Sequence, residues 1–205
     1  MFNLIKKDFL LMLSSKITLF TFLLFLPFYQ ILLADGSNFP IYLISIITLS
    51  YMLTTMSFAF EERNKPYIML NSLPIKSRDI VISKYIQMFI NYIIAVAYTF
   101  VYLKLVTFFN ISVPANFNIS TLKQAFILIV LSLCISLPLQ FKLPSKMARF
   151  INILIYVSIM NYFSTYLEDS LFYDSNTIML FALVFVTYFL SMGLSLLLYK
   201  NRDLS

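Results

Sequence analysis

The sequence predicts an all-α, polytopic membrane protein with six transmembrane helices in a single domain, residues 1–205, and three observations support this prediction. The chain is 60% hydrophobic and only 12% charged, with a mean hydropathy of +0.87. A soluble domain carries about 25% charged residues, so this chain cannot cover a globular surface with polar groups. Apolar runs long enough to cross about 30 Å of hydrocarbon recur along the chain. Basic residues are concentrated in alternate connecting segments, as in a membrane protein of fixed orientation.

The N-terminal segment, residues 1–16, is expected to form an amphipathic helix that lies in the membrane interface. Phe2, Ile5 and Phe9 recur near helical spacing, and basic residues stand between and after them. The alternative interpretation is a simple basic flank of the first span.

The first span is predicted at residues 17–34. Its apolar run is longer than the roughly 7–15 residues of a secretory signal peptide, so an uncleaved helix is expected. Pro27 is expected to kink this helix, because proline removes one ladder hydrogen bond. The remaining spans are predicted at residues 41–60, 85–109, 124–141, 150–167 and 177–199. Pro138 is expected to interrupt the fourth of the six.

The distribution of Lys and Arg predicts the orientation of these spans. Of the 15 basic residues, three stand in the N-terminal flank, five in residues 61–84, three in residues 141–149 and two in the C-terminal tail. The two that remain are Lys104 and Lys123. Because cytoplasmic loops carry the excess of Lys and Arg, the pattern predicts a multi-pass plasma-membrane protein with both termini and the loop 61–84 in the cytoplasm.

Residue counts exclude several kinds of chemistry. The chain has no histidine, one cysteine and two glycines. Most zinc sites, His-dependent catalysis and Gly-rich phosphate loops are therefore excluded. Glu61 and Glu62 stand before Arg63, which invites comparison with CAAX-type membrane proteases, but the histidines of that metal site are missing. No catalytic residue, metal site, cofactor or nucleic-acid-binding face is expected on this chain.

Four polar residues inside the predicted spans are candidates for a substrate path: Asn91, Lys104, Asn152 and Asn161. A charge within a span is costly and indicates function by default. Lys104 stands near the end of its span, however, so snorkelling of its side chain to the interface is the alternative. For the three asparagines, the alternative is hydrogen bonding between helices.

The loop 61–84 is the longest polar segment, and its pattern predicts a helix, a sharp break and a second, capped helix. Pro66 suits the start of a short helix over residues 67–71. Pro74 then breaks the chain, and Ser77 is a suitable N-cap for the helix that follows. From this pattern alone, a docking element and an ordinary solvated loop are equally good interpretations.

Three stretches around this loop carry a family resemblance. They are Phe58-Ala59-Phe60-Glu61-Glu62-Arg63-Asn64-Lys65, then Leu70-Asn71-Ser72-Leu73-Pro74-Ile75, then Arg78-Asp79-Ile80-Val81 with Ser83-Lys84-Tyr85. In these stretches the chain resembles the cytoplasmic loop of small ABC-2-type permeases, and the six spans and basic N-terminus suit the same family. Its composition, rich in Ile, Asn, Lys and Phe, is most similar to the permease subunits of staphylococcal exporters of phenol-soluble modulins, which are amphipathic, membrane-active peptides.

The resemblance implies a division of labour between subunits. A separate cytoplasmic ABC ATPase holds ATP and magnesium, and its dimerisation pushes on the short loop helix, residues 66–72. Two permease subunits, identical or homologous, form one pathway in the lipid, and the N-terminal helix also contacts the ATPase. The ATPase-coupling residues that the resemblance implies are Glu61, Glu62, Arg63, Lys65, Tyr67, Leu70, Ser72, Leu73, Pro74, Arg78 and Asp79.

The predicted function is therefore that of a permease subunit in an ATP-driven exporter of amphipathic cytolytic peptides, with resistance to those peptides as a second consequence. A drug, lantibiotic or lipid cargo is left open. The alternative from another class is a non-transporting membrane protein for immunity, sensing or assembly, whose loop contacts a regulator. An intramembrane enzyme is disfavoured, because histidine is missing and no predicted span holds a pair of acidic residues.

Overall fold

The computed structural model describes residues 2–14, 20, 24, 26–27, 41–64, 77–109, 119–143, 145–166 and 177–200. The regular elements of this part of the chain are all helices: α1 (Phe2–Ser14), α3 (Ile41–Asn64), α5 (Ser77–Phe108), α6 (Ile119–Lys142), α7 (Ser145–Tyr166) and α9 (Thr177–Lys200). For the described residues, the prediction of an all-α protein is confirmed.

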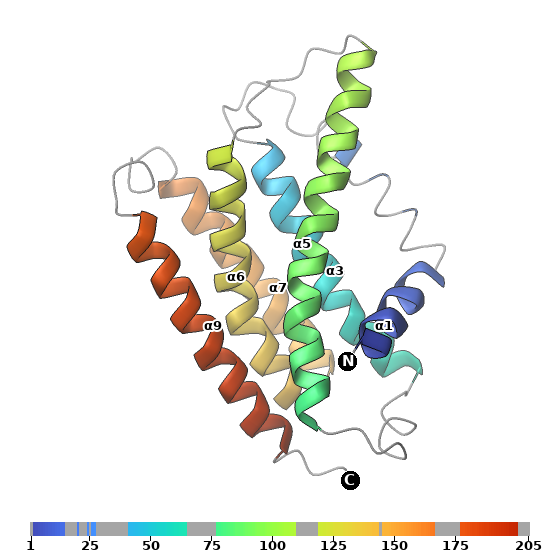
Figure 1. The fold of residues 1–205 in the computed structure, drawn as a ribbon, viewed down its shortest axis with the longest axis vertical. Helices are drawn as coiled ribbons and strands as arrows, with labels where there is room; N and C mark the ends of the chain where they lie inside the picture. Colours follow the sequence, from blue (N-terminus) through green and yellow to red (C-terminus); the bar gives the residue numbers. More distant parts are fainter. Residues whose placement is uncertain are drawn as a thin grey trace.

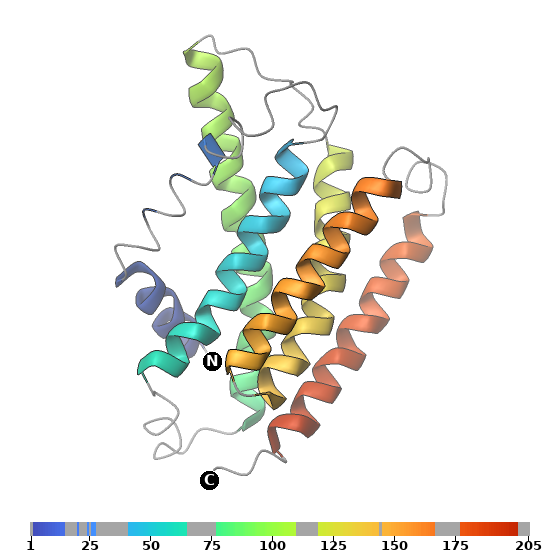
Figure 2. The ribbon, with the colours of Figure 1, turned by 180° about the vertical axis from the view of Figure 1, so that it is seen from behind.

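The five long helices run side by side as a bundle, and the shorter α1 lies outside it (Figure 1). α6 packs along α9, α3 packs against both α5 and α6, and α7 packs against α6. α1 contacts α3 and α5 near their lower ends, on the side of the bundle away from α9 (Figure 2). This arrangement places α1 beside the two helices that flank the loop 61–84.

α3 and α5 extend into the predicted loop from both sides. α3 ends at Asn64, and α5 begins at Ser77, ahead of the predicted span that starts at residue 85. No proline or glycine interrupts residues 77–84, and Asp79 in the first turn complements the positive end of the helix. With 32 residues, α5 is about 48 Å long, which exceeds the roughly 30 Å of the hydrocarbon layer. Its ends therefore reach beyond the hydrocarbon.

α6 contains Pro138 and nevertheless continues to Lys142. The structure thus differs here from the expected interruption of this span. Leu137 and Phe141, in the same stretch of helix, are 0% and 3% exposed. Their packing against the bundle offsets the ladder hydrogen bond that the proline removes.

Four of the described helices are long and apolar enough to cross a membrane, at Tyr42–Ala59, Arg78–Phe108, Leu122–Lys142 and Phe181–Lys200. The apolar stretch of α7, Met147–Ile159, is shorter. The predicted span at residues 17–34 lies outside the described residues, apart from residues 20, 24, 26 and 27. The count of six spans therefore stays a prediction.

The outer surface of the bundle is strongly apolar. Phe150 on α7 and Phe185 and Leu190 on α9 are each more than 60% exposed. A soluble monomer rarely exposes apolar side chains of this size over whole helices. The interior, by contrast, combines aliphatic residues with buried polar ones, such as Ser57, Lys84 and Asn91. Apolar residues outside and polar contacts inside are the pattern that a lipid environment favours.

Candidate functional site

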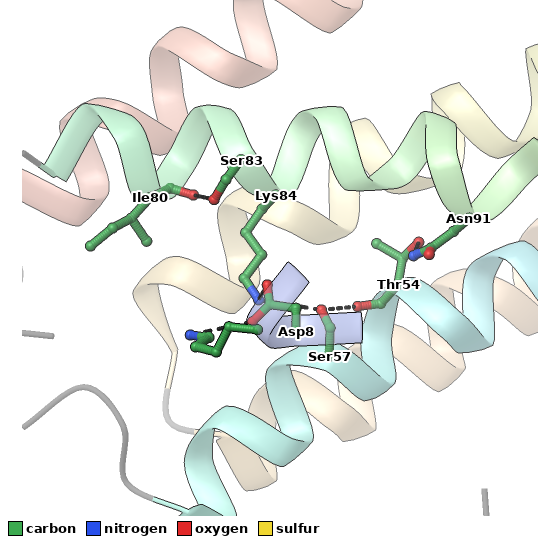
Figure 3. A network of polar contacts seen from close by, with 8 residues as sticks. Asp8, Thr54, Ser57, Ile80, Ser83, Lys84 and Asn91 are labelled. Atoms are coloured by element: carbon green, nitrogen blue, oxygen red, sulfur yellow. Dashed lines mark hydrogen bonds and ion pairs between the residues drawn. The ribbon is translucent and has the colours of Figure 1, made fainter. Parts of the chain in front are cut away.

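A buried ion pair joins α1 to the second turn of α5. Lys84 Nζ lies 2.7 Å from Asp8 Oδ2, and each side chain is only 2% exposed. Figure 3 shows the Lys84 side chain reaching from α5 to the carboxylate on α1, next to Ser57 of α3. Three helices therefore meet around one buried ammonium group.

The surroundings of Lys84 and Asp8 add weaker contacts to the pair. Lys84 Nζ lies 3.4 Å from Ser57 Oγ and 4.7 Å from the centre of the Phe58 ring. Lys7, which is 28% exposed, places its Nζ 3.3 Å from Asp8 Oδ1. A hydroxyl group and an aromatic face both interact favourably with an ammonium ion. Asp8 thus contacts two cations, Lys7 and Lys84. The buried Lys84 ammonium also contacts the Phe58 ring and the Ser57 hydroxyl.

The energetics of such a pair are asymmetric. Burying two charges costs desolvation energy that their attraction only partly returns, so the pair adds little net stability. Removing one partner, however, leaves the other charge buried and costs about 3–5 kcal/mol. The pair therefore specifies where α1 sits against α5 more than it stabilises the bundle as a whole.

Polar contacts continue from the ion pair into the bundle along α3 and α5. Ser57 Oγ donates to the carbonyl of Thr54 at 2.9 Å, and Asn91 Nδ2 donates to Thr54 Oγ1 at 3.0 Å. Figure 3 shows these residues in one line between the two helices. Thr54 in turn donates to the carbonyl of Ser50 at 2.8 Å. The bonds of Ser57 and Thr54 to backbone carbonyls lie within α3, and the bond from Asn91 to Thr54 joins α5 to α3 two turns beyond the ion pair.

The next residue of α5, Tyr85, makes a second polar junction on another side of the helix. Its hydroxyl lies 2.6 Å from Ser191 Oγ and 2.8 Å from Ser195 Oγ, both on α9. Ser191 Oγ donates its hydrogen to the carbonyl of Cys134 on α6 at 2.6 Å, so it accepts from Tyr85. Lys84 therefore connects the start of α5 to α1 and α3, and Tyr85 connects it to α6 and α9.

A third polar junction joins α3 to α7. Tyr51 Oη donates to the carbonyl of Asn152 at 2.9 Å, and Thr48 hydrogen-bonds to the hydroxyl of Tyr156. The rings of Tyr51 and Tyr156 lie 5.4 Å apart. These contacts hold α7 against α3.

A sequence model of the family described as ABC-2 family transporter protein matches residues 3–200, nearly the whole chain. The chain belongs to the ABC-2 transporter family. It is a membrane transport subunit of an ABC transporter, is not itself catalytic, and works with ABC ATPase subunits. No curated protein and no solved structure matches the chain.

The predicted ATPase-coupling residues of this permease fall into three groups. Glu61, Glu62 and Arg63 stand in the last turn of α3, and their side chains lie outside the described part of the structure. Arg78 is exposed and Asp79 is half-buried in the first turn of α5. The remaining six lie outside the described residues: Lys65, Tyr67, Leu70, Ser72, Leu73 and Pro74. The coupling role of all three groups stays a prediction.

The four substrate-path candidates are not brought together. Asn91 is buried and hydrogen-bonds to Thr54 between α5 and α3, the helix–helix contact given as its alternative. Lys104 is exposed toward the other end of α5, with its Nζ 5.7 Å from the centre of the Phe100 ring. Asn152 is buried on α7, and Asn161 is exposed farther along the same helix. The substrate-path role of these four residues stays a prediction.

Sequence reasoning missed the pairing of Asp8 with Lys84 and the junction at Tyr85. Two signals pointed toward the first: a single acid in an otherwise basic helix, and a lysine at the start of a long apolar run. Each of these residues is costly to bury alone, and pairing removes most of that cost. The junction at Tyr85 had no comparable signal, because Tyr, Ser191 and Ser195 are ordinary residues for membrane helices.

Proposed function

We propose that the permease is the membrane subunit of an ATP-driven exporter and that its loop 61–84 receives the force of the ATPase. The match of the ABC-2 family over residues 3–200 is the observation that carries this proposal. In it, two permease subunits, identical or homologous, form one pathway, and ATP and magnesium are held by the partner ATPase subunits.

The distribution of charge supports a cytoplasmic position for this loop. The lower end of the bundle in Figure 1 holds α1, the ends of α3, α6 and α9, and the starts of α5 and α7. The basic residues of these described segments are Lys6, Lys7, Arg63, Arg78, Lys84, Lys142, Lys146, Arg149 and Lys200. Only Lys104 and Lys123 belong to the other half of their helices. Cytoplasmic segments carry this excess of positive charge.

The ends of α3 and α5 suit the transmission of force. The segment between Asn64 and Ser77 joins two helices that pack against each other and meet α1 at the Lys84 ion pair. A push on this short segment would move the helix ends on both sides of it, which are held by hydrogen bonds and an ion pair. The bundle would then convert the displacement into a rearrangement of its pathway.

For the cargo, we propose an amphipathic, membrane-active peptide. The support is the general likeness of the chain, and of its composition rich in Ile, Asn, Lys and Phe, to the permease subunits of phenol-soluble modulin exporters. Such a peptide already resides in the membrane interface, so it can reach the permease along the bilayer. Comparing the peptide content of cells that contain or lack the chain tests this cargo. Unchanged export and unchanged resistance in its absence would remove the peptide assignment.

The coupling role is tested by truncating the two loop residues proposed to contact the ATPase. We expect Tyr67→Ala combined with Leu70→Ala to weaken ATPase binding at least about tenfold, because buried aromatic and aliphatic anchors dominate interface energies. The measurement is copurification of the ATPase with the permease, together with export. Phe185→Ala, a change on the lipid-facing side of α9, is the control and should leave both unchanged. Full binding and export in the loop variant would contradict the coupling role.

A further inference from the structure

We propose that Asp8 is a positioning residue of the transport cycle: its ion pair with Lys84 makes α1 and the start of α5 move as one rigid body. This inference rests on the proposed function, because it concerns what happens when an ATPase loads the loop 61–84. α1 is attached to the bundle through Asp8, which is buried, whereas Lys6, Phe9 and Leu10 around it are exposed. The helix therefore presents the carboxylate to the bundle, and Phe9 and Leu10 to the outside.

The contact between α1 and α5 resists opening. The two charged groups lie 2.7 Å apart and are 2% exposed, so separating them would leave an ammonium and a carboxylate in an environment of low polarity. The hydroxyl of Ser57 and the ring of Phe58 lie beside the ammonium but carry no net charge to replace the carboxylate. Sliding of α1 along α5 is therefore disfavoured while both charges are present.

The pair also stands at a definite place in the chain. Lys84 lies in the second turn of α5 and is the last residue of the loop 61–84, which is proposed to receive the force of the ATPase. Phe58, whose ring lies under the Lys84 ammonium, also packs edge-on against Phe141 of α6 at 5.3 Å. Displacement of the first turns of α5 is thus passed to α1 through Asp8. The apolar side chains of Phe9 and Leu10 then shift with it, against whatever surrounds α1.

A distance measurement tests the rigid body directly. Spin labels are placed on α1 by Lys6→Cys and on the third turn of α5 by Ile86→Cys, both exposed positions, in a Cys134→Ser background. The full transporter, with its ATPase, is measured in lipid without nucleotide and in a vanadate-trapped state. A second label pair, Ile86→Cys with Lys200→Cys, reports movement of α5 relative to α9. We expect an unchanged Lys6–Ile86 distance while the Ile86–Lys200 distance changes. A Lys6–Ile86 change as large as the other would overturn the proposal.

Paired substitutions separate a positioning role from a merely structural one. Asp8→Asn and Lys84→Met each leave one buried charge, so both are expected to lower the amount of folded permease. The neutral combination Asp8→Leu with Lys84→Met removes both charges and should restore folding, because apolar replacement of a buried pair is generally tolerated. We expect that combination still to transport about tenfold less cargo per ATP hydrolysed, because α1 is no longer held in register. The reversed pair, Asp8→Lys with Lys84→Asp, should recover transport to within about threefold.

The outcomes distinguish this inference from the function on which it rests. If the unmodified permease binds no ATPase and exports nothing, the proposed function fails. If it exports normally and the neutral combination is equally active per ATP, the pair is structural only and the positioning role is wrong. Loss of coupling in the neutral combination together with recovery in the reversed pair supports the positioning role.

Discussion

Lys84 and Tyr85 are consecutive residues that hold different sides of the same bundle. Lys84 pairs with Asp8 on α1 and approaches Ser57 on α3, whereas Tyr85 hydrogen-bonds to Ser191 and Ser195 on α9. Successive residues of a helix point about 100° apart, so two neighbours can reach two different partners. At the scale of single residues, this point of α5 is connected to α1, α3 and α9 at once.

The carboxamide of one buried residue beside this point, Gln87, finds no partner in the described part of the chain. Gln87 lies one turn beyond Lys84 and is 2% exposed, and neither atom of its carboxamide has a hydrogen-bond partner among the described residues. We expect Gln87→Met to raise the free energy of unfolding by about 1 kcal/mol, because an unpaired buried polar group costs about 1–3 kcal/mol and Met keeps a similar shape. Unfolding in detergent micelles, followed by circular dichroism, measures the change.

Gln124→Met provides the control for this substitution. Gln124 stands on α6 and is half-buried, so its carboxamide keeps access to polar surroundings. The same change there should alter stability by less than about 0.5 kcal/mol. If Gln87→Met instead lowers stability, its carboxamide has a hydrogen-bond partner in the folded subunit, such as a buried water.

At the scale of elements, the helices differ in how much of their surface is buried in the bundle. α3 and α6 are largely enclosed by the bundle, whereas most of α9 is exposed apart from the face that packs on α6 and α5. Gly193 lies within α9, and a Cβ atom added there would meet no described residue within 4 Å. The glycine is therefore not required for close packing among the described helices.

We expect Gly193→Ala to stabilise the isolated subunit by about 0.5–1 kcal/mol, because glycine carries the greatest loss of backbone freedom in a helix. Thermal unfolding in detergent, at a concentration where the permease is a single subunit, measures the gain. Ala182→Gly, at an exposed position of the same helix, should destabilise by a similar amount. A lower stability of Gly193→Ala would mean that a second subunit or another segment occupies the space beside the glycine.

At the scale of the whole molecule, basic residues gather at the end of the bundle that carries α1 and the loop 61–84 (Figure 1). The outer surface between the two ends is apolar, so the bundle has one orientation that satisfies both the lipid and the positive-inside rule. α6 offers a direct test, because it has an exposed lysine near each end, Lys123 and Lys142.

We expect opposite accessibility for cysteines at these two positions. In a Cys134→Ala background, Lys123→Cys should react with a membrane-impermeant thiol reagent added to intact cells. Lys142→Cys should react only after the membrane is permeabilised. The reverse pattern would place the loop 61–84 outside the cell and remove it from the reach of a cytoplasmic ATPase.

The sequence by itself determined the class of the protein and the approximate positions of its long helices. Long apolar runs and the shortage of charge are properties of the chain, so they predict membrane helices without any knowledge of packing. Pro74 and the N-cap at Ser77 placed the helix that starts there, and the prediction of an all-α protein is confirmed over the described residues. The family followed from the motif around the loop, whereas the coupling residues and the cargo stay predictions.

Only the tertiary structure decided which polar residues meet. Asp8 and Lys84 stand far apart in the chain, and so do Tyr85 and Ser191, so their contacts depend on how the helices are arranged in space. Periodicity within one helix gives the direction of a side chain but not the identity of the helix opposite it. It also cannot tell a lysine that snorkels from one that is buried against a carboxylate. Lys104 is exposed and Lys84 is buried, although both lie on α5, because α1 brings a counter-charge to only one of them.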